Sequence, residues 1–194
     1  MAIAESREIV VKKTIHDDSW VRAEVVDVEF DTGKKISDFL LLTGKNGGFV
    51  SVCARLSDGR FLLVRQCKPA AGLTIESIAG GRKGDETWEE AAARELLEET
   101  GYVAGRMIRV GEWDGIFTQT DRIVNPCHLY LGFDCVPSAE TAEGDEVQGV
   151  ERIILETRHV LDMIRTGLIR DMPTIAGIYA HLLHEKGVPV GAGG

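Results

Sequence analysis

Apolar and polar residues alternate along much of the chain, which is the pattern of half-buried β-strands. Val21–Phe30 alternates in this way, and after the turn Asp31-Thr32-Gly33 the alternation returns in Ile36–Leu42. A turn at Ser57–Arg60 separates two further apolar runs and predicts a hairpin. The predicted strands of this later part are Phe49–Leu56, Phe61–Gln66, Thr74–Ala79, Arg106–Glu112, Leu129–Val136 and Gly149–Leu155.

Apolar residues recur with the helical period in the remaining segments, Trp88–Thr100, Thr157–Arg165 and Thr174–His184. The glycine-containing stretch Gly44–Gly48 interrupts the pattern and marks a domain boundary. We therefore expect a small antiparallel sheet in residues 1–45, a main domain in residues 46–188 and a flexible tail in residues 189–194. The element order predicts an α/β fold, with helices on both faces of a mixed sheet.

The predicted helix at residues 88–100 carries a stripe of carboxylates. On a helix, Glu95 lies three positions from Glu98 and four from Glu99, so the three side chains share one face. Like charges at this spacing repel unless a cation lies among them. Carboxylate oxygens are hard ligands of the kind that hold Mg²⁺ against a phosphate. A solvated acidic helix face is the plain alternative for such a cluster.

The acidic helix belongs to a longer pattern. Gly80 is followed after five residues by Glu86 and, after seven more, by Arg94-Glu95-Leu96-Leu97-Glu98-Glu99-Thr100-Gly101-Tyr102. This run resembles the box of the Nudix hydrolases, with Tyr102 in place of the usual aliphatic residue. The resemblance implies a Nudix fold and hydrolysis of a nucleoside diphosphate linked to another group, with Mg²⁺ or Mn²⁺. It also implies that the metal ligands are Glu95, Glu98, Glu99 and the carbonyl of Ala79, with Arg94 orienting the carboxylates.

Three segments extend the resemblance beyond the box, at Leu62–Gln66, Glu76–Gly80 and Met163–Asp171. They resemble the ADP-ribose and nucleotide-sugar pyrophosphatase branch. The branch implies substrate-binding roles for Arg65, Glu76 and Lys68, where Lys68 replaces an arginine that binds the diphosphate. Residues 117–125 also lack the Pro-Gly pair and the glutamate that the branch often carries there. Both departures affect the choice of substrate, for which we expect ADP-ribose first and GDP-mannose-like sugars second. Trp20 is a candidate for stacking on a base, and ordinary packing is an equal alternative.

Attack on phosphorus needs a group that takes a proton from water. The branch keeps this glutamate in an acidic loop before a strand, which corresponds to residues 138–146. Asp145-Glu146 fits this position best, so Glu146 is the predicted base, and Glu143 and Glu140 are the alternatives.

Charge and composition limit the classes of binding partner and the cellular compartment that we expect for this protein. A net charge of −9 without a basic run argues against a nucleic-acid groove, and no stretch approaches a membrane span. Four cysteines without a CxxC pair or an export signal predict a reduced, cytoplasmic protein. In the resembling branch the N-terminal sheet is shared across a homodimer, so a homodimer is expected. The alternative function is a non-catalytic Nudix-fold nucleotide sensor, which the complete box disfavours.

Overall fold

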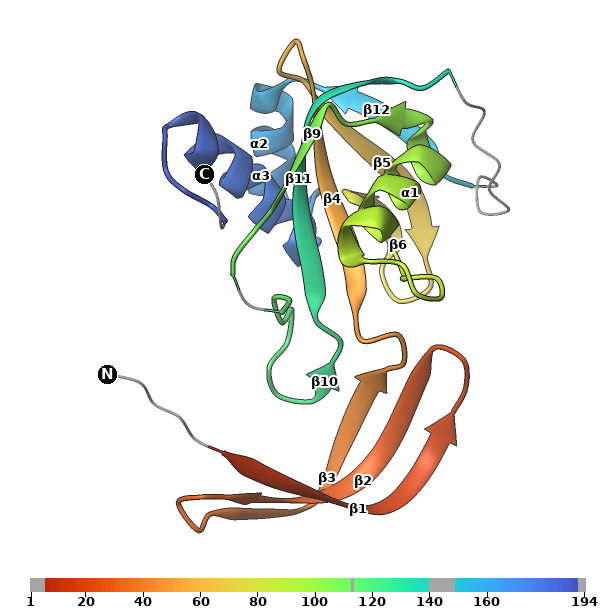
Figure 1. Cartoon of the computed structure of the whole chain (residues 1–194), viewed down its shortest axis with the longest axis vertical. Helices are drawn as coiled ribbons and strands as arrows, with labels where there is room; N and C mark the ends of the chain where they lie inside the picture. Colours follow the sequence, from red (N-terminus) through yellow and green to blue (C-terminus); the bar gives the residue numbers. More distant parts are fainter. Residues whose placement is uncertain (1–5, 113, 140–148, 192–194) are drawn as a thin grey trace.

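The chain, for which residues 6–112, 114–139 and 149–191 are described in a computed structural model, forms two sheets and three helices (Figure 1). The smaller sheet lies at one end of the molecule and has the order β1-β2-β3-β10. Its strands are β1 (Arg7–Asp17), β2 (Val21–Phe30), β3 (Lys35–Gly44) and β10 (Ile123–Val124).

The larger sheet has eight strands, and its main path runs β12-β5-β4-β11-β8. β11 pairs parallel with β4, whereas the other pairs are antiparallel, so the sheet is mixed as predicted. The strands are β4 (Phe49–Leu56), β5 (Phe61–Lys68), β6 (Gly72–Glu76), β7 (Ile78–Gly80), β8 (Tyr102–Val103), β9 (Arg106–Arg109), β11 (Cys127–Pro137) and β12 (Glu151–Leu155).

Helices cover both faces of this sheet (Figure 1). α1 (Trp88–Thr100) packs Ala92 and Leu96 on one face, against alternate residues of β4 and β5. α2 (Thr157–Arg165) and α3 (Met172–Glu185) pack on the other face, where Val160 and Ile178 meet the residues that point the opposite way. Alternation along the strands thus builds two apolar layers, and the predicted α/β/α sandwich is confirmed.

The connection between the two sheets is short, because β3 ends at Gly44 and β4 begins at Phe49. The small sheet also takes a strand from the later part of the chain, since β10 pairs parallel with β3, Ile123 lying opposite Leu42. The division into residues 1–45 and 46–188 stays a prediction. No sequence signal pointed to β10, which has two residues and no alternation of its own.

The strand expected at Thr74–Ala79 differs from the structure, because it is divided: β6 pairs with β5 while β7 pairs with β4. At the division, the Ser77 amide donates to the Thr174 hydroxyl (2.8 Å). In the tail expected at 189–194, the Gly111 amide donates to the Val190 carbonyl and Gly191 bridges to Gly111. The flexibility of residues 189–194 stays a prediction.

None of the helices in the described ranges combines the length and apolarity of a membrane span.

Candidate active site

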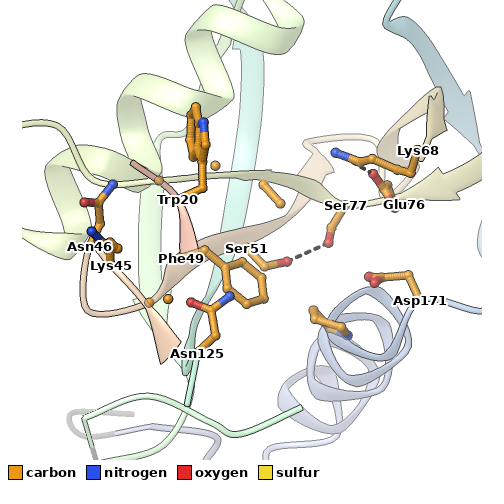
Figure 2. Close-up of a pocket in the computed structure, with 16 residues that line it drawn as sticks. Trp20, Lys45, Asn46, Phe49, Ser51, Lys68, Glu76, Ser77, Asn125 and Asp171 are labelled. Atoms are coloured by element: carbon orange, nitrogen blue, oxygen red, sulfur yellow. Dashed lines mark hydrogen bonds and ion pairs between the residues drawn. The ribbon is translucent and has the colours of Figure 1, made fainter. Parts of the chain in front are cut away.

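Two adjoining cavities open between the small sheet and the sandwich. The first, of about 380 Å³, includes Lys45, Asn125 and Asp171 in its wall and is named the hinge cavity (Figure 2). The second, of about 720 Å³, includes Glu95 and Glu99 and is named the carboxylate cavity. They form one continuous cleft, because they share the wall residues Trp20, Asn46, Lys68, Ala79, Gly80 and Gly81.

Local sequence signals fix where α1 begins and ends, and its acidic stripe lies beside the carboxylate cavity. Thr87 and Glu90 form a capping box at the start of α1, and Gly101 ends the helix in the left-handed conformation (φ 68°). Between these caps, Glu95 is 3 % exposed and Glu99 is partly buried. Both line the carboxylate cavity, whereas Glu98, on the same stripe, is not among its wall residues.

Arg94 is the centre of the charge network beside the stripe. Its guanidinium donates to Glu86 (2.7 Å), Glu95 (2.7 Å) and Glu98 (2.8 Å), and to the carbonyl of Gly81 (2.7 Å). Burial by itself lowers the pKa of Arg94, but the surrounding carboxylates outweigh it and raise the pKa above its ordinary value. The same contact with Arg94 lowers the pKa of Glu86. Arg94 is therefore a permanent cation that fixes the carboxylates in place.

Gly80 permits the close approach of α1 to β7. A Cβ atom at this position would lie 2.1 Å from the carboxyl group of Glu95. Since that group is buried and held by Arg94, it has no room to move aside. A side chain at residue 80 would thus displace Glu95, which explains in physical terms why the pattern begins with glycine.

The donor set at the carboxylate cavity fits a hard divalent cation. Within the described ranges, no three His, Cys, Asp or Glu side chains are grouped closely enough to enclose a metal ion. Mg²⁺, however, is commonly held by one or two carboxylates together with substrate phosphates. Glu95 and Glu99 supply two such carboxylates, and Ala79 lies in the same wall with its backbone carbonyl as a further oxygen donor.

Of the predicted substrate residues, Lys68 and Glu76 lie together in the cleft. The Lys68 ammonium is 3.3 Å from the Glu76 carboxylate, which also accepts from Gln66 (2.8 Å). Arg65 borders neither cavity. Its guanidinium donates to Glu151 (2.8 Å), the residue directly opposite on β12. This contact is a cross-strand pair of opposite charge, and the substrate-binding role of Arg65 stays a prediction.

Trp20 lies in the wall of both cavities, in the turn between β1 and β2 (Figure 2). Its side chain is 71 % exposed, so it is not packed in the core of this chain. The turn itself is ordered by Asp18, which accepts from the amides of Trp20 (2.7 Å) and Val21 (2.8 Å). An exposed indole at a cavity wall is available for stacking.

Several wall residues of the hinge cavity were missed by sequence reasoning. Ser77 joins a buried chain of hydroxyl contacts, with Ser51 at 2.7 Å and Thr174 at 3.1 Å, and Thr174 donates to Asp171 (2.6 Å). Asp171 with Pro173 is an N-terminal helix signature, which would have placed the start of α3 correctly. Asn125 carries no comparable local signal.

The predicted base Glu146 and its alternatives Glu143 and Glu140 lie outside the described residues. The segment that follows them does reach the cleft, because Gly149 and Val150 line the carboxylate cavity.

The larger part of the chain matches a known protein family. The family model described as "NUDIX domain" matches residues 47–166. This range includes β7 and α1, with the carboxylates Glu95, Glu98 and Glu99. The chain belongs to the Nudix family. Nudix hydrolases generally act with divalent metal ions, in agreement with the oxygen donors of the Nudix helix α1.

Individual relatives resemble nearly the whole chain. An ADP-ribose pyrophosphatase of Bacillus subtilis is 29 % identical over 178 residues, covering 91 % of this chain and 92 % of the relative. A GDP-mannose pyrophosphatase of Salmonella arizonae is 26 % identical over 189 residues, covering 92 % and 97 %. A crystal structure titled as an ADP compounds hydrolase superposes with a TM-score of 0.73 at 19 % identity, covering 93 % and 96 %, which supports the Nudix fold.

Proposed function

We propose that this protein is a divalent-metal-dependent pyrophosphohydrolase of nucleoside diphosphate sugars, which releases a nucleoside monophosphate and a sugar phosphate. The observation that carries the proposal is the continuous cleft, in which a wall of carboxylates adjoins a second cavity lined by amides and an exposed tryptophan. The carboxylate cavity suits a metal-bound diphosphate, and the hinge cavity has room for a group attached to it.

The relatives support a nucleotide sugar as the substrate class. Matches to an ADP-ribose pyrophosphatase and a GDP-mannose pyrophosphatase extend over about nine-tenths of the chain, so they include the small sheet as well as the Nudix domain. We favour ADP-ribose, followed by GDP-mannose-like sugars.

Several residues in and beside the cleft have a chemical role in this proposal. Glu95, Glu98, Glu99 and the Ala79 carbonyl hold the metal, which when bound neutralises the diphosphate and makes its phosphorus more electrophilic. Arg94 keeps the carboxylates in position, Lys68 attracts the diphosphate, and Trp20 stacks on the base. Water attacks one phosphorus atom, its proton passes to the proposed base Glu146, and the bridging P–O bond breaks.

A substrate panel tests the proposal. We expect ADP-ribose to be hydrolysed with Mg²⁺ or Mn²⁺, with a preference in kcat/KM below about tenfold, or about 1.4 kcal/mol, over at least one other nucleotide sugar. The reason is that Lys68 is a mobile point charge where an arginine would bind two oxygens in a plane. Release of phosphate monoester measures the rate for each nucleotide sugar and for nucleoside triphosphates.

The Glu99→Gln variant is the low-activity control for this panel, because it lacks one proposed metal ligand. A strong preference for a triphosphate would refute the nucleotide-sugar assignment, and metal-independent binding without turnover would favour the non-catalytic sensor.

The small sheet supports the further proposal of a cytoplasmic homodimer. Every residue of β1 is exposed in the single chain, and four of them are large and apolar, namely Ile9, Val10, Val11 and Ile15. A second subunit would remove these side chains from water. All four cysteines are free, which suits a reducing compartment.

Light scattering at micromolar concentration should therefore give twice the chain mass of 21.2 kDa. Val10→Glu in β1 places a charge among these exposed apolar side chains, and we expect it to shift the protein toward the monomer. Leu168→Glu is the matched control, because Leu168 is similarly exposed (59 % against 53 %) but lies between α2 and α3. A wild-type monomer, or equal effects of the two variants, would contradict the proposed dimer interface.

A further inference from the structure

Both carboxylate oxygens of Glu98 contact cations. The ammonium of Lys83 lies 3.1 Å from Oε1 and 3.1 Å from Oε2, and Arg94 donates to Oε2 at 2.8 Å. These contacts oppose the binding of a metal ion to either oxygen, since like charges would be brought within a few ångströms of each other. For Glu98 to become a ligand, one of the two cations has to leave.

The two cations are held very differently. Arg94 has an 18 % exposed side chain and further contacts with Glu86, Glu95 and the Gly81 carbonyl, so its release would break several charge-assisted hydrogen bonds. The Lys83 side chain is 65 % exposed, and within the described part of the chain its ammonium contacts Glu98 alone. Exposed ion pairs of this kind are weak. Lys83 is therefore the cation that can leave.

The main chain at Lys83 is fixed although its side chain is exposed. Its amide donates to Glu86 (2.8 Å), and Glu86 is in turn held by Arg94. Movement is thus confined to the side chain, whose rotatable bonds allow the ammonium to reach other positions near the loop. Lys83 also belongs to the wall of the carboxylate cavity, where the diphosphate is proposed to bind.

We propose that Lys83 is an exchangeable counter-ion: it neutralises Glu98 before the metal arrives and transfers its charge to the substrate diphosphate when the metal takes its place. The inference rests on the proposed function, because it assigns a part of the metal and diphosphate site. It gives Lys83 two effects of opposite sign, since the residue opposes metal binding in the free enzyme and favours substrate binding in the loaded enzyme.

To test the first effect, Mn²⁺ is titrated into the substrate-free enzyme, and its binding is measured by electron paramagnetic resonance. Lys83→Met keeps the unbranched stem and removes the charge, and we expect it to lower the Kd for Mn²⁺ about threefold to tenfold. Arg82→Met is the matched control. Arg82 is the neighbouring cation in the same cavity wall, but its guanidinium stacks over Trp88 (4.6 Å), so we expect less than a twofold change.

Kinetics with ADP-ribose at saturating Mn²⁺ tests the second effect. We expect Lys83→Met to raise KM at least about threefold, because the diphosphate loses one cation. Tighter metal binding together with a higher KM is a combination that a purely structural role of Lys83 does not produce.

Specific results would overturn the inference. An unchanged or weaker Mn²⁺ affinity in Lys83→Met shows that Lys83 does not compete for Glu98, and equal effects in Arg82→Met show only a general charge effect. An unchanged KM rules out the transfer to the diphosphate. The Mn²⁺ titration requires no turnover, so a failure of this inference is distinct from a failure of the wild-type enzyme to hydrolyse nucleotide sugars.

Discussion

Replacing Glu99 by glutamine is expected to lower kcat at least about 10²-fold, with a matching loss of Mn²⁺ affinity. Glu99 and Glu95 are the two α1 carboxylates that line the carboxylate cavity, and Glu95 already accepts a hydrogen bond from Arg94, which neutralises part of its charge. The amide of glutamine keeps the size of the side chain but removes the negative charge that a dication requires. Loss of one electrostatic catalytic group typically has this magnitude. Steady-state kinetics and Mn²⁺ titration measure the two effects.

Glu89→Gln is the control for this prediction. It makes the same chemical change on the same helix, but Glu89 is exposed in the first turn and borders neither cavity of the cleft. We expect its kcat to stay within about twofold of the wild type. Unchanged turnover of Glu99→Gln at saturating Mg²⁺ would refute the assignment of Glu99 as a metal ligand.

The parts of the site that the sequence predicted are those built from local signals. The limits of α1 follow from the capping box at Thr87 and from Gly101, and the helical period then places Glu95, Glu98 and Glu99 on one face. The sandwich was predictable for a similar reason, since alternation in β4 and β5 already defines two apolar faces.

The parts that escaped prediction depend on contacts between distant segments. β10 exists only because its two residues meet β3, some eighty positions earlier in the chain (Ile123 opposite Leu42). The division of the strand at Ser77 depends on the hydroxyl of Thr174, which lies on α3. The contact of Arg65 with Glu151 depends in the same way on the pairing of β5 with β12. Such pairings are decided by tertiary packing, which a single sequence does not display.

The structure also explains why the box tolerates so many acidic residues. Arg94 donates hydrogen bonds to Glu86, Glu95 and Glu98. Lys83 forms a second contact with Glu98, so the negative charge of the cluster is partly neutralised without any metal. The pattern of charges by itself predicted a metal site, whereas the contacts show which carboxylates are already engaged. Glu99 and Glu98 are adjacent in sequence, yet only Glu99 faces the carboxylate cavity.

The largest loss of activity is expected from Glu146→Gln, which should lower kcat about 10²- to 10⁴-fold while leaving Mn²⁺ affinity nearly unchanged. Gly149 and Val150 line the carboxylate cavity, and three residues of extended chain span at most about 11 Å. Covalent geometry therefore limits the main chain of residue 146 to within about 11 Å of Gly149, whereas the limit for residue 143 is about 20 Å. Single-turnover kinetics, with Mn²⁺ titration of the same variant, measures both quantities.

Glu143→Gln is the matched control, because it removes the same charge from the same acidic segment three positions earlier. We expect its kcat to fall less than about tenfold, since charge alone is screened over such distances whereas proton transfer requires hydrogen-bond contact with the water. If Glu143→Gln or Glu140→Gln shows the large loss instead, the segment is correct and Glu146 is not the base. If all three variants retain full activity, water must be activated at the metal held by Glu95 and Glu99, without a carboxylate from this segment.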